Sequence, residues 1–289
     1  MSKISWTDET INPVIGCSKI STGCVNCYAM KMAARLARMG LNGYDEVVRF
    51  DKNGKYLPLW NGETAFIESA LEKPLHWTKP RLIFVCSMAD LFHESVPFEW
   101  VRKILDVVSI GHDYLGPEHT FIFLTKRPAK MTECFARYYA ERGFAGGEFL
   151  RNAWLGITAE NQEQYNKRWP IASQIPASVL FVSCEPLLGP IDFSRHERKP
   201  DWLIAGGESG LGARPMHPDW ARSLRDQCVS AGVPFHFKQF GEWAPVPISD
   251  PVPDRVFKNA PAFDGAVWKI GRKKAGNVLD GKVWQEFPK

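Results

Sequence analysis

A chain of 289 residues, 45% of them hydrophobic and 24% charged, can bury a sizeable core, so neither a disulfide nor a metal is needed for folding. Basic residues number 36 against 32 acidic ones, a balance that permits a nucleic-acid partner without demanding one. No apolar run reaches the ~18 residues of a membrane span, and the first nine residues lack the apolar core of a secretory signal. We therefore expect a cytoplasmic protein with no membrane partner.

The amino-terminal elements frame a cysteine-rich loop. We expect a short strand over residues 12–15 and a helix over residues 28–39, with Cys17, Cys24 and Cys27 between them in a C-x6-C-x2-C spacing. Iron–sulfur clusters are held by cysteine thiolates. Three thiolates with no fourth ligand nearby in the sequence predict a four-iron cluster in which one iron stays free to bind a small molecule.

A zinc ion is the alternative to a cluster in this loop, because three cysteines and one histidine can coordinate zinc. His93 and His112 are the candidates for the fourth position, although neither is close to the loop in the sequence. The other cysteines stand singly in apolar or helical surroundings, where a reduced thiol packs as a small hydrophobic group. They are Cys86, Cys134, Cys184 and Cys228.

From residue 81 onward, short apolar runs alternate with amphipathic stretches, the pattern of repeated βα units. We expect buried strands over residues 81–86, 120–124, 153–157, 179–184, 202–205 and 234–237. The helices between them are expected over residues 99–110, 129–142, 162–172 and 219–231. This alternation predicts an α/β fold with parallel strands, and we favour a single partial or complete βα (TIM-like) barrel over an open doubly wound sheet.

Two regions fall outside this repeat. Residues 41–77 form an expected insertion after the first helix, and residues 241–289 combine several prolines with six Trp or Phe residues. So many aromatic residues argue against disorder. We therefore expect a barrel over residues 1–240 and a C-terminal extension over residues 241–289 that packs back on it.

Polar or charged residues end every expected strand, where α/β folds bind their ligands. Acids and cations together suit a zwitterionic ligand, because its ammonium needs a carboxylate and its carboxylate needs a cation. The candidate cofactor contacts are Ser87, Asp90, Glu160, Ser183, Glu185, Gly206, Gly207 and Glu208. The candidate substrate contacts are Lys126, Arg127, Arg214 and Lys238.

The run Gly206-Gly207-Glu208-Ser209-Gly210 has two interpretations. Its glycines would let backbone amides approach a ligand closely, but the same run is also typical of a tight turn between a strand and a helix. It lacks the Lys-Ser/Thr ending of a nucleotide-binding P-loop, which argues against that class of site.

Several motifs together resemble the phage-associated three-cysteine-motif proteins, a family of unknown function related to radical S-adenosylmethionine (SAM) enzymes. The resemblance covers nearly the whole chain. The motifs that carry it are Trp6-Thr7, Asn12-Pro13-Val14, Cys24-Val25-Asn26-Cys27-Tyr28, Ser87-Met88-Ala89-Asp90-Leu91-Phe92-His93, Ser183-Cys184-Glu185-Pro186-Leu187-Leu188-Gly189-Pro190-Ile191, Gly206-Gly207-Glu208-Ser209-Gly210 and Phe237-Lys238-Gln239.

The resemblance implies a βα barrel in which Cys17, Cys24 and Cys27 hold a four-iron, four-sulfur cluster and SAM binds its free iron. It further implies reductive cleavage of SAM to methionine and a deoxyadenosyl radical, with electrons from an external donor. The cysteine spacing departs from the usual C-x3-C-x2-C, and the aromatic residue, Tyr28, follows the last cysteine instead of preceding it.

The association with phages suggests a nucleic-acid base or a nucleotide as substrate, with Lys126, Arg127 and Lys238 meeting phosphate. The need for a partner protein is left open. The rival hypothesis is a non-catalytic module, bearing zinc or a cluster, that binds a nucleic acid or a protein.

Overall fold

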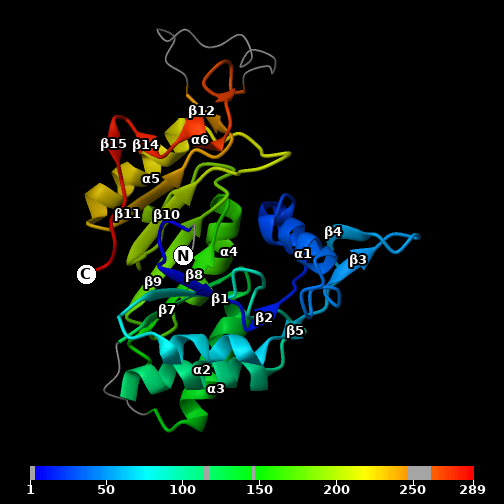
Figure 1. The fold of residues 1–289 in the computed structure, drawn as a ribbon. Helices are drawn as coiled ribbons and strands as arrows, with labels where there is room; N and C mark the ends of the chain where they lie inside the picture. The colour runs from blue at the N-terminus through cyan, green and yellow to red at the C-terminus, as the bar shows by residue number, and fades with distance from the viewer. Residues whose placement is uncertain (1–3, 114–117, 145–146, 246–261) are drawn as a thin grey trace. The chain divides into compact units, whose positions relative to one another are not determined.

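The computed structural model describes residues 4–113, 118–144, 147–245 and 262–289, with only the backbone described at 111–113 (Figure 1). These residues form two compact units. The first comprises residues 1–157 and 171–180, and the second comprises residues 158–170 and 181–289. Among the described residues, no helix combines the length and the apolar character that a transmembrane segment requires.

Seven strands are hydrogen-bonded in the order β1-β6-β7-β8-β9-β10-β11. The pairs formed by β1, β6, β7 and β8 are parallel, as are those formed by β9, β10 and β11. Their central residues are almost all buried and apolar, as expected for parallel strands covered on both faces. The strands are β1 (Glu9–Ile11), β6 (Leu82–Val85), β7 (Thr120–Thr125), β8 (Ala153–Thr158), β9 (Val179–Cys184), β10 (Trp202–Gly206) and β11 (Phe235–Gln239).

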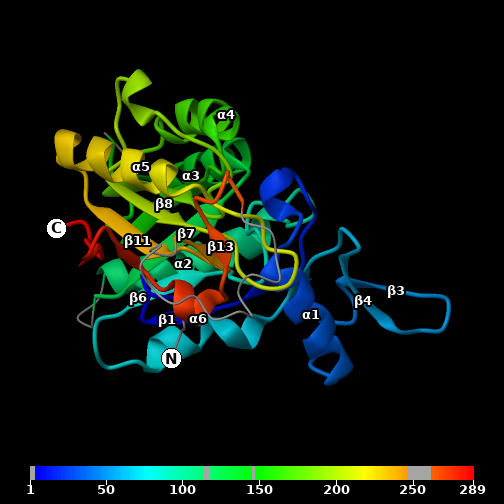
Figure 2. The same ribbon diagram turned by 90° about the horizontal axis from the view of Figure 1, so that it is seen from above.

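Helices alternate with these strands along the chain. Helix α3 starts with Pro128 and α5 with Pro218, and a proline suits the first turn because its missing N–H has no partner there. In the second unit, α5 packs against β10 and β11 (Figure 2). The helices are α1 (Tyr28–Arg38), α2 (Phe98–Asp113), α3 (Pro128–Glu141), α4 (Gln162–Ala172), α5 (Pro218–Ala231) and α6 (Arg272–Ala275), with 3-10 turns η1 (Thr22–Cys24), η2 (Glu68–Leu71), η3 (Lys73–His76) and η4 (Phe193–Arg195).

The predicted α/β class with parallel strands is confirmed, and six of the seven expected strands lie within two residues of their predicted bounds. A TIM-like closure is not confirmed, because the hydrogen-bonded order ends at β1 and β11. The first strand was predicted wrongly. Residues 9–11 pair with β6, whereas β2 (Val14–Ile15) pairs antiparallel with β5 (Ala65–Phe66). Pro13 explains the break, since it has no N–H with which to continue a ladder.

The expected insertion after α1 supports the cysteine loop within the first unit. Its hairpin of β3 (Val48–Phe50) and β4 (Tyr56–Trp60) packs against α1. Cys17 and Cys27 pack at the edge of the apolar cluster that results. The buried members of the cluster are Ile15, Ala29, Met30, Ala33, Ala37, Val47, Val48, Trp60, Ala65 and Met88.

The last residues of the chain pack onto β10 and β11 within the second unit. The indole Nε1–H of Trp202 donates to the Glu286 carbonyl at 2.9 Å, and the Phe237 N–H donates to the Trp284 carbonyl at 2.8 Å. Two short antiparallel pairs precede this contact, β12 (Trp243–Ala244) with β13 (Trp268–Lys269) and β14 (Val278–Leu279) with β15 (Lys282–Val283). The predicted boundary near residue 240 stays a prediction, and Phe257 lies outside the described residues.

Gly16, which precedes the first cysteine, has a backbone conformation that requires glycine. Its φ is +92°, and a Cβ atom there would lie 2.3 Å from the Glu63 carbonyl oxygen. Its N–H donates to the Met88 carbonyl at 3.1 Å, which ties the loop to the segment after β6. Gly16 therefore fixes the position of the backbone from which the Cys17 side chain extends.

We predict that Gly16→Ala lowers the free energy of unfolding by at least about 3 kcal/mol, because it adds a clash with backbone to an unfavourable φ. Gly40→Ala is the matched control: its φ of +71° is similar, but its Cβ would meet nothing within 4 Å. We expect that variant to lose only about 1 kcal/mol. Chemical denaturation of both variants measures the difference, and equal losses would contradict this account of Gly16.

Candidate functional site

The three cysteines of the loop are held by local backbone structure in the first unit. After Cys17, the chain forms the η1 turn, in which the Cys24 N–H donates to the Ser21 carbonyl at 3.0 Å. Cys27 occupies the N-cap position of α1. All three cysteines are free and partly exposed.

The electrostatic surroundings of Cys17 include the other two cysteines of the loop. The pKa of Cys17 is raised to about 12, chiefly by burial and then by Asp90, whereas Arg127 acts to lower it. Cys27 and Cys24 also raise this pKa. Within the described part of the chain, no three His, Cys, Asp or Glu side chains are arranged to hold a single metal ion.

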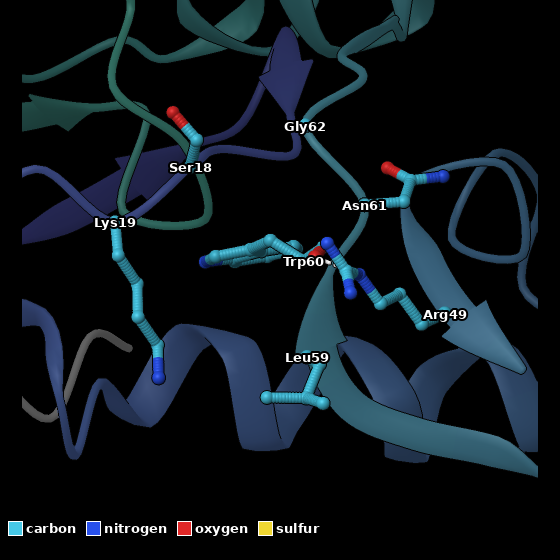
Figure 3. A pocket seen from close by; sticks show the side chains of 7 residues that line it. All are labelled: Ser18, Lys19, Arg49, Leu59, Trp60, Asn61 and Gly62. Carbon is cyan, nitrogen blue, oxygen red and sulfur yellow. Dashed lines mark hydrogen bonds between the residues drawn. The ribbon is translucent and has the colours of Figure 1, made fainter.

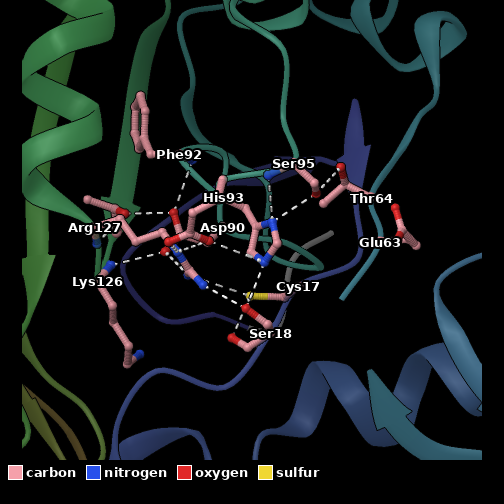
Figure 4. A network of polar contacts seen from close by, with 12 residues as sticks. Cys17, Ser18, Glu63, Thr64, Asp90, Phe92, His93, Ser95, Lys126 and Arg127 are labelled. Carbon is pink, nitrogen blue, oxygen red and sulfur yellow. Dashed lines mark hydrogen bonds and ion pairs between the residues drawn. The ribbon is translucent and has the colours of Figure 1, made fainter. Parts of the chain in front are cut away.

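Asp90 is the centre of a buried polar network beside this loop (Figure 4). Its Oδ1 accepts from the Thr125 hydroxyl at 2.6 Å and from the Phe92 N–H at 3.1 Å. Its Oδ2 accepts from the Lys126 N–H at 3.2 Å and from Arg127 Nη1 at 3.0 Å. A carboxylate has about four acceptor positions, so the network itself uses the capacity of Asp90.

Arg127 connects this network to the cysteine loop. Its Nη2 donates to the Ser18 hydroxyl at 2.9 Å, and its Nη1 lies 3.9 Å from the Cys17 sulfur. Its Nε donates to both oxygens of Glu94, at 2.8 and 2.9 Å. The Arg127 side chain is only 6% exposed. We expected Arg127 to meet a substrate phosphate, but the structure places its guanidinium among these protein partners.

His93 is held between two serines in the same network. Its Nδ1 accepts from the Ser95 N–H at 3.2 Å, which leaves Nε2 as the donor to the Ser18 hydroxyl at 2.7 Å. Burial lowers the pKa of His93, and Arg127 lowers it further, so the ring is neutral at neutral pH. Nε2 also lies 3.5 Å from Glu94 Oε2, so both ring nitrogens have protein partners in this network.

The segment after β6 is tied to the loop by a second set of hydrogen bonds. The Tyr28 hydroxyl donates to the Ser87 carbonyl at 2.8 Å. Asn12 Oδ1 accepts from the Ser87 hydroxyl at 3.1 Å and from the Met88 N–H at 3.0 Å. The Ser87 side chain, a predicted cofactor contact, is therefore engaged by Asn12.

Lys126 differs from the other predicted residues of the first unit, because only its backbone N–H joins the network. Figure 4 shows its side chain directed away from the other polar groups. No carboxylate of the described residues pairs with its ammonium group, which is half-buried. Of the four cations predicted to contact substrate, Lys126 alone makes no ion pair with a described residue.

Glu160, in the second unit, forms a fully buried ion pair. Its Oε2 accepts from Arg168 Nη1 at 2.9 Å, and the same nitrogen donates to the Thr158 carbonyl at 2.8 Å. The exposed fractions of Glu160 and Arg168 are 0% and 4%. A buried charge of this kind needs its partner, so a ligand could bind this carboxylate only by displacing Arg168.

Glu185 is paired with another predicted residue. Its Oε1 lies 3.0 Å from the Lys238 ammonium, and the Ser183 hydroxyl donates to its Oε2 at 3.4 Å. A Cβ atom on Gly206 would lie 2.8 Å from Glu185 Oε1. The structure thus brings Ser183, Glu185, Gly206 and Lys238 together, with the glycine leaving room for the carboxylate.

Glu208 is paired with Arg214 in the same unit. Arg214 Nη2 donates to Oε1 at 2.6 Å, and its Nε donates to Oε2 at 3.0 Å, a two-point contact. A Cβ atom on Gly207 would lie only 1.9 Å from the Phe240 carbonyl oxygen. Backbone packing therefore requires the second glycine. The run is not a tight turn between a strand and a helix, because eleven residues separate the end of β10 from the start of α5.

Four contributors to the network around Asp90 were not among the predicted site residues: Ser18, Glu94, Ser95 and Thr125. Glu94 and Thr125 do stand just after β6 and at the end of β7. Their position at strand ends was a usable signal. Ser18 and Ser95 give no such signal, because a single serine in a loop is unremarkable in sequence.

The two carboxylates that bind Arg127 differ in exposure, which allows a matched comparison. The side chain of Asp90 is 10% exposed and that of Glu94 is 69% exposed. Removing one partner of a buried pair leaves an uncompensated charge, so we predict that Asp90→Asn lowers the free energy of unfolding by about 3–5 kcal/mol. Glu94→Gln should cost less than about 1 kcal/mol. Denaturant titration tests this, and equal losses would contradict the central role of Asp90.

Comparison with known proteins identifies a family. The model of a family described as "Protein of unknown function (DUF5131)" matches residues 1–288. No curated protein and no solved structure matches the chain. Because the match spans nearly every residue, the chain belongs to the DUF5131 family of proteins of unknown function.

Proposed function

We propose that this protein is a radical SAM-type iron–sulfur enzyme whose cluster is held by Cys17, Cys24 and Cys27. The observation that carries the proposal is that three free cysteines stand in one short loop, where Cys24 and Cys27 both act electrostatically on Cys17. The loop is followed by a helix, α1, and lies in the chain between β1 and the other six strands of the seven-stranded sheet. When bound, such a cluster supplies the one-electron reduction that splits SAM and yields a deoxyadenosyl radical.

The residues of the first unit fit this cofactor. Thiolates are the ligands that iron–sulfur clusters use, and three of them leave one iron open. The Arg127 guanidinium lies 3.9 Å from the Cys17 sulfur. Hydrogen bonds to the sulfurs tune the potential of a cluster, and groups behind the ligands fix their orientation. We therefore assign Arg127 and Asp90 to positioning Cys17, in place of direct contact with substrate or SAM.

The contacts to SAM and to the substrate are part of the same proposal. We retain a nucleic-acid base or nucleotide as the substrate class, on the strength of the family resemblance. Lys126 is the best-placed of the predicted cations in the first unit, because its ammonium is not consumed by an ion pair with a described residue.

One observation favours a second candidate, a non-catalytic cluster-bearing module. Glu160, Glu185 and Glu208 all have protein cations as partners. Carboxylates that are already paired need no cofactor to balance their charge. A module of this kind would hold the cluster as a structural element and would leave SAM intact.

We predict that replacing any one of Cys17, Cys24 or Cys27 by Ala removes most of the iron and sulfide taken up on anaerobic reconstitution, because each cysteine supplies one of three ligands. Cys134→Ala is the control, since that thiol is buried within α3. It should leave the iron content unchanged. Iron and sulfide analysis with a circular dichroism check of folding measures this, and equal iron loss in all four variants would oppose the assignment.

The decisive functional experiment is anaerobic incubation of the reconstituted protein with SAM and a strong reductant, followed by chromatography for deoxyadenosine. We expect deoxyadenosine from the unaltered protein and none from Cys24→Ala, because a missing ligand prevents cluster binding. A protein with a full cluster that leaves SAM intact would favour the non-catalytic module. A colourless protein with one zinc ion and no sulfide would contradict a cluster and would favour a zinc-bearing, non-catalytic module.

A further inference from the structure

A pocket of about 280 Å³ lies beside the cysteine loop in the first unit (Figure 3). Ser18 and Lys19 line it from the loop, and the β3–β4 hairpin and the residues just after it supply the remaining wall. Those residues are Arg49, Leu59, Trp60, Asn61 and Gly62. The volume is near the lower end of ligand pockets, so the pocket suits one small group of a larger molecule.

The charge of this pocket is positive. Lys19 and Arg49 are both exposed, and neither forms an ion pair with any residue that the structure describes. Their two segments are 30 positions apart in the chain, and no acidic side chain lines the pocket. Figure 3 shows the two cations on opposite sides of the Trp60 ring. Such a pair attracts an anion.

Arg49 is oriented for this task by the hairpin itself. Its Nε donates to the Trp60 carbonyl at 3.2 Å, which fixes the plane of the guanidinium. No described residue accepts from its Nη1 or Nη2. A guanidinium with two free N–H groups matches two oxygens of a phosphate, and a lysine ammonium adds a point charge.

The apolar residues of the pocket wall indicate which kind of anion the pocket would bind. Leu59 and Trp60 offer a surface that suits a sugar or a base better than an inorganic ion in water. Lys19 is only two positions from Cys17, so a molecule anchored here lies beside the cysteine loop. Anchoring a remote part of a substrate is a common way to position its reacting part.

We propose that this pocket binds a phosphate group of a nucleotide unit, through Arg49 and Lys19, and so anchors the substrate beside the cysteine loop. The inference deepens the proposed function and rests on it for the meaning of the bound molecule as substrate. The binding itself needs only the first unit's own residues. It can therefore be measured without SAM, reductant or cluster.

The test is fluorescence anisotropy of a labelled single-stranded oligothymidylate, with the full chain in cluster-free and reconstituted forms. Arg49→Gln and Lys19→Gln should each weaken binding about tenfold, the loss expected for one charge-assisted contact. Each should also reduce the slope of affinity against salt by about one. Lys52→Gln is the matched control, because Lys52 is exposed on the same hairpin and does not line the pocket. It should bind as the unaltered protein does.

Competition experiments distinguish binding of a nucleotide from binding of inorganic phosphate or of an acidic peptide. We expect thymidine monophosphate to displace the labelled probe, and inorganic phosphate or an oligoglutamate peptide to do so only at much higher concentration. If Lys52→Gln weakens binding as much as the two pocket variants do, general surface charge binds the probe and the proposed pocket does not. The same conclusion follows if oligoglutamate displaces the probe as readily as the nucleotide does. Absence of probe binding to the unaltered protein would also overturn the proposal. None of these results would alter the deoxyadenosine assay, so the two proposals fail separately.

Discussion

The structure of the first unit depends on one buried contact, the ion pair between Asp90 and Arg127 at 3.0 Å. Asp90 follows β6 and Arg127 follows β7, so the pair joins two adjacent strand ends. This buried pair has two physical requirements. The desolvated charges require each other, and the remaining guanidinium nitrogens must find partners, which they do in Glu94 and Ser18 and beside the Cys17 sulfur. The cysteine loop is thereby attached to the ends of the parallel strands.

Apolar packing supports the loop from the other side. Helix α1 and the β3–β4 hairpin enclose a cluster against which Cys17 and Cys27 pack. Gly16 sets the start of the loop by its close approach to the Glu63 carbonyl. A site that must hold several ligands in register needs this kind of support, because a ligand displaced by about 1 Å binds poorly. The insertion is thus part of the site, and it also carries the cationic pocket.

The elements of the repeat could be predicted closely from the sequence. The strand at residues 179–184 matches to the residue, because it is an apolar run of clear length. The helix at residues 162–172 also matches, although its apolar periodicity is weak and it contains Pro170. The first strand could not be predicted, since a run of three residues gives little signal. The charged residues at strand ends were identified, but their pairing was not. Which acid meets which cation, as in Glu185 with Lys238, depends on the spatial order of the loops and not on local spacing. The pairing of Arg127 with Asp90 could not be predicted for the same reason.

The central claim is that three thiols hold a cluster with one iron open to SAM. The electron paramagnetic resonance spectrum of the anaerobically reconstituted and chemically reduced protein tests it most directly, when recorded before and after SAM is added. The account predicts the signal of a reduced four-iron cluster whose shape changes when SAM binds. A signal that SAM leaves unchanged, or no iron–sulfur signal in a folded protein with intact thiols, would contradict it.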